Sequence, residues 1–245
     1  NLSNVTSMTI GIQGPGATGT LLLDDVRLYS YDRQLIAPVD PGTAGLKAHY
    51  EFEGNANDSS GNGRHGTIVG NPTFAAGQIG QAINFDATGD YVEFDDTGLP
   101  EGNAPRTMSV WIKPEGAGVR SALEWGSNAN TQRCGILVQP SNGIKFVGKW
   151  ADVASNGSVA NGEWHYVAEA YDGTNMRIYI DGVLDKEQAV SINTVLNVGR
   201  IGVNIQSTGE FFNGAIDEVR IYDRALTQEE IAWLAGRTQP FDKPF

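Results

Sequence analysis

Apolar residues occur along most of the chain in short alternating runs, separated by clusters of glycine, asparagine and aspartate. A period of two is typical of strands buried on one face, and Asp-Gly or Asn-Gly pairs between such runs favour hairpins. The pattern therefore predicts an all-β sandwich or barrel. The expected strands of the main body are 46–53, 66–69, 82–85, 91–94, 107–113, 121–125, 134–139, 144–149, 164–171, 176–180, 183–189, 198–203 and 211–222.

One segment near the C-terminus departs from this pattern and predicts a short helix over 228–235. Thr227 and Glu230 have the spacing of a capping box, in which the threonine oxygen accepts from the N3 amide and the glutamate reaches back to the N-cap amide. Ile231, Leu234 and Ala235 form an apolar stripe, and Gly236 is placed to end the helix.

The beginning of the chain repeats part of its end. Asp24, Val26, Arg27 and Tyr29 match Asp217, Val219, Arg220 and Tyr222 in register. We therefore expect four parts: a terminal β-hairpin over 1–31 that resembles the end of an upstream domain, a linker over 32–45, the main domain over 46–236 and an extended tail over 237–245. A hairpin is marginally stable alone, so this one is either a remnant or an element that adds to a sheet edge of a neighbouring molecule.

Composition narrows the function classes. The net charge of −12 argues against nucleic-acid binding, which needs a basic surface, and fits an extracellular protein or one that holds cations. The single cysteine, Cys134, excludes an internal disulfide framework. No apolar run approaches the ~20 residues of a membrane helix, so we expect no membrane insertion. The start at Asn1 suggests a mature or excised chain.

The segment 212–226 closes the predicted domain and carries an acidic pair, Asp217 and Glu218. By simple alternation, Glu218 shares a face with Ile216, and Asp217 shares the opposite face with Val219. An acidic pair at the start of a closing strand suits a contact with a loop or a metal ion.

Three stretches together resemble the laminin-G-like, or concanavalin A-like, jelly-roll domains of bacterial extracellular proteins. They are 46–63 (LKAHYEFEGNANDSSGNG), 161–182 with its NGEWHYVA and YIDG motifs, and 214–226. The resemblance covers about residues 45–236. It implies two antiparallel sheets packed face to face, often with a structural calcium ion, in domains that commonly bind glycans or act as adhesion spacers.

The loop 54–66 is rich in oxygen-bearing side chains and glycines. Calcium takes roughly six to eight oxygen ligands, and Asp58 and Asn62 offer side-chain oxygens here. The resemblance implies that Asp217 adds a carboxylate from the closing strand. We therefore expect a structural Ca²⁺ site at Asp58, Asn62 and Asp217. The alternative is an Asx-rich surface turn, with Asp217 paired to Arg220 or another cation.

Glycoside hydrolysis is a further possibility, because the same family fold includes glucanases. Those related to laminarinases carry Glu-x-Asp-x-x-Glu on one strand, and no such string occurs in this chain. Glu51 and Glu53 share a strand face, but the residues that follow them are Gly-Asn-Ala-Asn. The histidines are scattered, without a Ser-His-Asp order or a zinc-ligand spacing. We therefore expect no enzymatic activity.

Sugar sites pair an aromatic platform with a few hydrogen-bonding side chains. Trp111 alternates with the aliphatic residues of its strand and therefore faces away from them, whereas Trp125 and Trp150 stand at strand ends where loops gather. Trp150, Trp125 and Trp111 are the candidate ligand-binding residues. For each of them, the alternative is packing beneath neighbouring loops.

The leading interpretation is a non-catalytic, calcium-stabilised carbohydrate-binding (lectin-like) module of a secreted or cell-surface protein, with a glycan or polysaccharide as its partner. A second interpretation is a structural or adhesive subunit that self-associates through β-strand addition by its N-terminal hairpin. A third is a glycoside-active enzyme.

Overall fold

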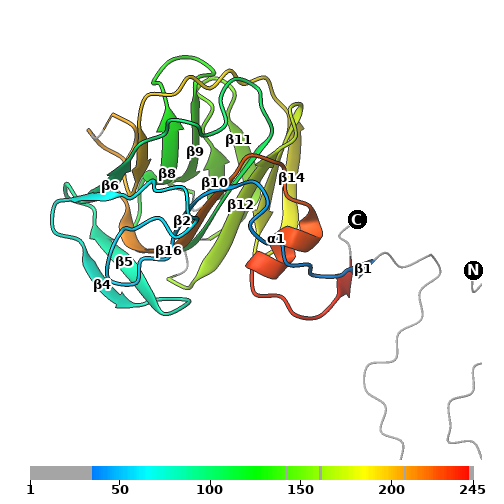
Figure 1. Ribbon diagram of the computed structural model, residues 1–245, viewed down its shortest axis with the longest axis horizontal. Coiled ribbons are helices and arrows are strands. Elements are labelled where there is room, and N and C mark those ends of the chain that lie inside the picture. The colour runs from blue at the N-terminus through cyan, green and yellow to red at the C-terminus, as the bar shows by residue number, and fades with distance from the viewer. Residues whose placement is uncertain (1–34, 142, 160–161, 207, 243–245) are drawn as a thin grey trace, which may run out of the picture.

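The computed structural model describes residues 35–141, 143–159, 162–206 and 208–242. Figure 1 shows two antiparallel sheets packed face to face, with one short helix at the side of the larger sheet. The predicted all-β sandwich is confirmed, and its architecture agrees with a jelly roll. Among the described residues, no helix is long and apolar enough to cross a membrane.

The larger sheet has the strand order β14-β13-β12-β7-β16-β5-β4, and β2 also pairs with β16. Its central strand, β16, pairs with β7 along one edge, while β5 and β2 share its other edge. The strands are β2 (Leu46–Tyr50), β4 (Thr73–Ala76), β5 (Gln81–Asp86), β7 (Arg106–Pro114), β12 (His165–Tyr171), β13 (Asn175–Ile180), β14 (Val183–Ala189) and β16 (Asn213–Tyr222).

The smaller sheet has the strand order β11-β10-β9-β8-β15-β6-β3. It includes two strands, β3 and β15, that are only three residues long, and β11 was not expected from the sequence. The strands are β3 (Thr67–Val69), β6 (Tyr91–Phe94), β8 (Arg120–Gly126), β9 (Arg133–Val138), β10 (Gly143–Phe146), β11 (Val153–Ser158) and β15 (Gly199–Ile201).

The main core fills the space between the sheets. Met108, Val110 and Ile112 of β7 point into it, as their alternation predicts, and Ile136 and Phe146 face them from the smaller sheet. Alternate residues of the smaller sheet therefore point outward. That outer face carries the hollow described below.

A second apolar cluster covers the outside of the larger sheet. Trp111 and Tyr166 lie there with Ile231 and Leu234 of helix α1 (Gln228–Leu234). The predicted capping box is present: Thr227 accepts from the amide of Glu230, whose side chain accepts from the Thr227 amide. The helix thus covers this outer face of the larger sheet.

Strand β16 contains a β-bulge that corrects the predicted alternation. Its pairing with β7 shifts between Asp217 and Arg220, and Glu218 adopts φ 52°. Ile216 and Val219 therefore both face the core, while Asp217 and Glu218 both point outward. A bulge inserts one residue into the alternation, which is why strict period-two counting put Glu218 on the wrong face.

The two ends of the described chain meet. Strand β1 (Leu35–Ile36) pairs with β17 (Phe241–Asp242), and the Val39 amide donates to the Glu229 carbonyl of α1. Part of the segment expected as a linker is thus attached to the domain, next to α1 (Figure 1). The hairpin expected over 1–31, and any self-association through it, lie outside the described residues.

Candidate functional site

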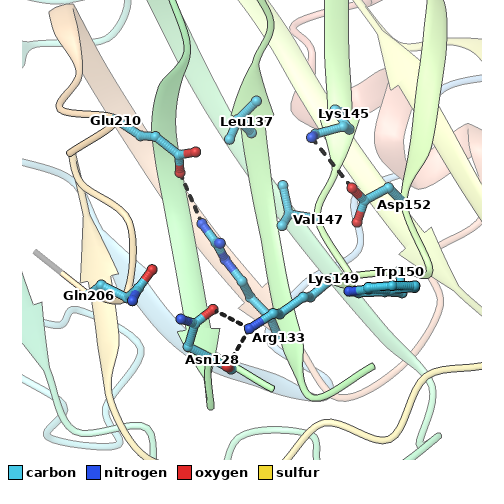
Figure 2. A pocket seen from close by; sticks show the side chains of 10 residues that line it. All are labelled: Asn128, Arg133, Leu137, Lys145, Val147, Lys149, Trp150, Asp152, Gln206 and Glu210. Atoms are coloured by element: carbon cyan, nitrogen blue, oxygen red, sulfur yellow. Dashed lines mark hydrogen bonds and ion pairs between the residues drawn. The ribbon is translucent and has the colours of Figure 1, made fainter. Parts of the chain in front are cut away.

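A hollow of about 380 Å³ opens on the outer face of the smaller sheet. Leu137 of β9 and Val147 after β10 form its apolar floor, and polar side chains surround them (Figure 2). Three loops contribute the walls: one connects β8 to β9, one follows β10, and one connects β15 to β16. The lining residues are Asn128, Arg133, Leu137, Lys145, Val147, Lys149, Trp150, Asp152, Gln206 and Glu210.

A buried ion pair organises one side of the hollow. Arg133 donates from Nε to Oε2 of Glu124 (2.7 Å) and from Nη2 to Oε1 (2.5 Å). Glu124 is completely buried, and it also accepts from Ser121 Oγ and the Ile205 amide. Burial opposes the charge of Arg133, but the bonds to Glu124 prevail and raise its pKa. The guanidinium is therefore held in one orientation.

The other charged side chains of the hollow are also paired. Glu210 accepts from Arg133 Nη2 at 3.1 Å, and Lys145 lies 3.4 Å from Asp152. Lys149 Nζ donates to the backbone carbonyl and the side-chain oxygen of Asn128. Figure 2 shows these contacts arranged around the floor. They fix the positions of hydrogen-bond donors and acceptors before any ligand arrives.

Trp150 is the most exposed large apolar side chain of the described residues, at 83%. It follows Lys149 in a tight turn in which both residues have positive φ, 48° and 77°. The Gly148 amide donates to Asp152 Oδ1 across this turn. Such backbone conformations cost energy for residues other than glycine and cluster at functional sites. The turn therefore holds an indole in solvent at the edge of the hollow, at a cost in backbone strain.

The other two candidate tryptophans are buried, which corrects their expected role. Trp125 lies in the core between the sheets, and its Nε1 donates to the Pro100 carbonyl. Trp111 does face away from that core, as its alternation predicts, but it packs edge-on against Tyr166 in the cluster beneath α1. Neither ring offers a surface to a ligand.

The expected calcium residues hold two different loops in place. Asp58 accepts from the amides of His49, Ser60 and Arg64, each at 2.9 Å. Burial opposes its ionisation, but these hydrogen bonds prevail and lower the pKa of Asp58. Asn62 turns its amide nitrogen toward the carbonyls of 46–47. Both side chains thus organise the loop after β2.

Asp217 contacts a different loop, the turn 77–80 before β5. Its Oδ2 accepts from the Ile79 amide at 2.9 Å, whereas its buried Oδ1 has no hydrogen-bond partner among the described residues. Burial raises the pKa of Asp217 to about 6. Glu53 holds the same turn, since its Oε1 accepts from the Gln81 amide, and a Cβ at Gly80 would collide with its carboxylate. A buried carboxylate oxygen without a hydrogen-bond partner, next to a tight turn that a second carboxylate also holds, suits a hard cation.

The bulge also brings Glu218 into a cluster of ion-paired side chains on the outer face of the larger sheet. Glu218 contacts His49 Nε2 at 2.9 Å and also Arg220, while Glu51 lies 3.8 Å from His49 Nδ1. Arg220, the partner that the alternative interpretation assigned to Asp217, is thus bound to Glu218. His49 and Arg220 lower the pKa of Glu218 despite its burial.

Sequence reasoning found Trp150 but missed the polar side of the hollow. Glu124 and Lys145 stand in outward positions between core residues of β8 and β10, and Arg133 stands in the outward position just before Cys134 of β9. Charged residues that alternate with apolar ones on three neighbouring strands could have indicated a polar outer face. Glu210 and Gln206 come from a loop whose course no periodicity predicts.

A family model described as the concanavalin A-like lectin/glucanases superfamily matches residues 86–232. A comparison with curated proteins gives no match. Among solved structures, domain 4 of AbnA, a GH43 extracellular arabinanase from Geobacillus stearothermophilus in complex with arabinotriose, is 28% identical. It aligns over 78% of this chain and 98% of its own, with a TM-score of 0.66.

Two toxin structures share the fold at lower identity. The binding domain of Paraclostridial Mosquitocidal Protein 1 is 15% identical, with a TM-score of 0.63 and 78% of this chain covered. A structure of botulinum neurotoxin type C, whose cell entry is dependent upon interaction with two ganglioside molecules, is 17% identical, with a TM-score of 0.64 and 80% covered. The match spans about half of each toxin chain, 52% and 51%. By its family match over most of the sandwich, this chain belongs to the concanavalin A-like lectin/glucanase superfamily.

Proposed function

We propose that this chain is a non-catalytic carbohydrate-binding module of a secreted or cell-surface protein, and that the hollow on the smaller sheet is its glycan site. The observation that carries the proposal is Trp150, which a strained turn holds in solvent at the edge of a polar hollow. An indole in solvent leaves a large flat apolar surface free to pack against a ligand, and its place at the edge of a polar hollow gives that surface hydrogen-bonding neighbours.

The chemistry of the hollow suits a sugar ring. One face of a sugar is apolar and packs on an aromatic ring, while its hydroxyls need donors and acceptors in fixed positions. Trp150 supplies the ring, Arg133 supplies N–H donors, and Asp152 and Glu210 supply acceptors. Because these groups are already fixed by one another, binding requires little side-chain ordering.

The arabinanase domain supports the same proposal. It covers the sandwich at 28% identity, comes from an extracellular enzyme and was determined with arabinotriose bound. We therefore propose a glycan ligand and an extracellular location for this chain as well. The toxin domains support the fold alone, because they are only 15% and 17% identical to this chain.

The arrangement of carboxylates favours binding over hydrolysis. A glycosidase needs one carboxyl group that is free to donate a proton and a second that acts as nucleophile or base. Both carboxylates that line the hollow are held in ion pairs, Asp152 with Lys145 and Glu210 with Arg133. The site is built to hold hydroxyl groups.

We also propose that Ca²⁺ stabilises the domain, with Asp217 as the central ligand. Its unpaired Oδ1 and the Glu53 carboxylate bound at the same turn support this placement, and carbonyls of the turn 77–80 are the natural further ligands. Asp58 and Asn62, which belonged to the expected set, serve the neighbouring loop. Calcium would offset the buried negative charge of Asp217 and hold β16 to the turn before β5.

A glycan array tests the proposed function directly. The labelled domain is applied with calcium, with EDTA, and as the Trp150→Ala variant. We expect retention of at least one glycan class that is lost in the variant, and weaker retention in EDTA through loss of stability. If the folded wild-type protein binds no glycan, the proposal is wrong.

A further inference from the structure

The charges around the hollow also indicate which glycans it takes. We infer, given the proposed function, that the site selects uncharged glycans and discriminates against those that carry carboxylates, such as uronic or sialic acids. Sites that capture acidic ligands present cations with free donors to the anion. Here Arg133 and Lys145 are already paired with carboxylates of the protein, and Lys149 donates to Asn128.

Arg133 is the clearest case. Its Nε and Nη2 are bound to both oxygens of Glu124, and Nη2 also contacts Glu210. Two carboxylates thus face one guanidinium. Arg133 can still donate a hydrogen bond to a hydroxyl, but its charge is more than balanced, and an incoming carboxylate would meet Glu210 at the same place.

Both lysines also have partners within the protein, one a carboxylate and the other a neutral side chain. Lys145 lies against Asp152, and Lys149 Nζ is turned to the carbonyl and side-chain oxygen of Asn128. The lining holds three cations (Arg133, Lys145 and Lys149) and two carboxylates (Asp152 and Glu210), and the buried Glu124 beneath Arg133 brings the sum of charges at the site to zero. The chain as a whole carries −12, so its long-range field adds repulsion toward anions.

A hydroxyl-bearing ligand fits this arrangement. Asp152 and Glu210 accept from hydroxyls, and Arg133 donates to them, without desolvating a charge on the ligand. An acidic sugar would instead have to displace an internal carboxylate from its cation. The site thus offers hydrogen bonds to neutral sugars and repels acidic sugars electrostatically.

The test compares neutral oligosaccharides with acidic counterparts: lactose with 3′-sialyllactose, and xylo-oligosaccharides with their glucuronic acid-substituted forms, together with arabinotriose. The double variant Asp152→Asn/Glu210→Gln removes two negative charges and keeps the side-chain oxygens. The matched control, Asp172→Asn/Glu187→Gln, removes two carboxylates that pair with Arg177 on β13, away from the hollow.

We expect the wild-type protein to prefer neutral members by at least about tenfold at low salt. The site variant should reduce that ratio by about fivefold per removed charge, an effect that salt screens, and the control should leave it unchanged. Equal or tighter binding of acidic members by wild-type protein overturns the inference and leaves the proposed function standing. A neutral preference that the site variant does not alter also overturns it, and binding of no glycan at all contradicts both.

Discussion

The guanidinium of Arg133 and the carboxylate of Glu124 form a bidentate ion pair, joined by two hydrogen bonds, and Glu124 is completely buried beneath the hollow. The pair joins β8 to β9. Glu124 also accepts a hydrogen bond from the amide of Ile205, in the loop before β16. It therefore connects the stability of the smaller sheet to the position of a donor in the site.

Removal of one partner of this pair should be costly. Glu124→Ala leaves the buried guanidinium without its main partner, and we expect a loss of about 3–5 kcal/mol in the free energy of unfolding. The double variant Glu124→Leu/Arg133→Met, which removes both charges, should recover much of that loss. Urea unfolding measures both. Equal stability of the single and double variants would show that the charge interaction is not what Glu124 contributes.

Truncation of the exposed indole should separate binding from stability. Trp150→Ala removes a ring that is 83% exposed, so the melting temperature should change little while glycan affinity falls by at least about tenfold, or ~1.4 kcal/mol. Trp233→Ala on α1, a ring that is 43% exposed, is the matched control and should leave affinity unchanged. A similar loss in both variants would indicate a non-specific effect.

Calcium should raise thermal stability through Asp217. At about 100 times its dissociation constant, a ligand of the native state adds ~2.7 kcal/mol, which corresponds to roughly 5–10 °C for a domain of this size. Asp217→Asn should abolish the calcium-induced rise in melting temperature. Asp58→Asn should lower the stability of the protein but retain that rise. Since burial raises the pKa of Asp217 to about 6, protons compete with calcium, and the shift should shrink as the pH falls below that value. A melting temperature unaffected by EDTA at pH 7.5 would refute the calcium proposal.

A buried carboxyl group in the core should make the protein less stable as the pH rises. Glu169 lies opposite Met108 of β7 and Ile178 of β13 in the sheet and points with them into the core. Neither of its carboxyl oxygens has a hydrogen-bond partner among the described residues. Burial raises its pKa well above the usual value. The protonated form thus favours the folded state, so its contribution is full below the unfolded pKa and is lost as the pH rises through the folded one.

Glu169→Gln removes that titration. We expect the variant to exceed the wild-type protein in stability by at least about 1 kcal/mol at pH 8, and by less at pH 5. Denaturant unfolding at both pH values checks this, with the exposed Glu187→Gln as control. A variant that is less stable than wild type at pH 8 would mean that an ionised Glu169 has a stabilising partner.

The regular parts of the fold were predictable because short-range patterns determine them. The alternation of Met108, Val110 and Ile112 identified the core face of β7, and the Thr227–Glu230 capping box identified the start of α1. Both signals act within a few residues of the chain. The edge strand β4, with its exposed Ala75 and Ala76, carries no such signal.

The candidate site was predictable only in part. Trp150 could be named as a strand-end tryptophan, but the same criterion selected Trp125, because a position at a strand end does not show whether the ring points into the core or into solvent. The bulge at Asp217 and Glu218 brings Glu218 to the same face as Asp217, and it lies where the pairing of β16 passes from β5 to β2. Such a long-range arrangement leaves no local signal in the sequence.

Chemical-shift mapping of the ¹⁵N-labelled domain, titrated with the glycan best retained on the array, tests the central claim most directly. The account predicts concentration-dependent shifts of the Trp150 indole N–H and of the amides of Gly148, Arg133, Gln206 and Glu210, with β14 and α1 unchanged. Shifts confined to another surface, or none at saturating glycan, would contradict a carbohydrate site on the outer face of the smaller sheet.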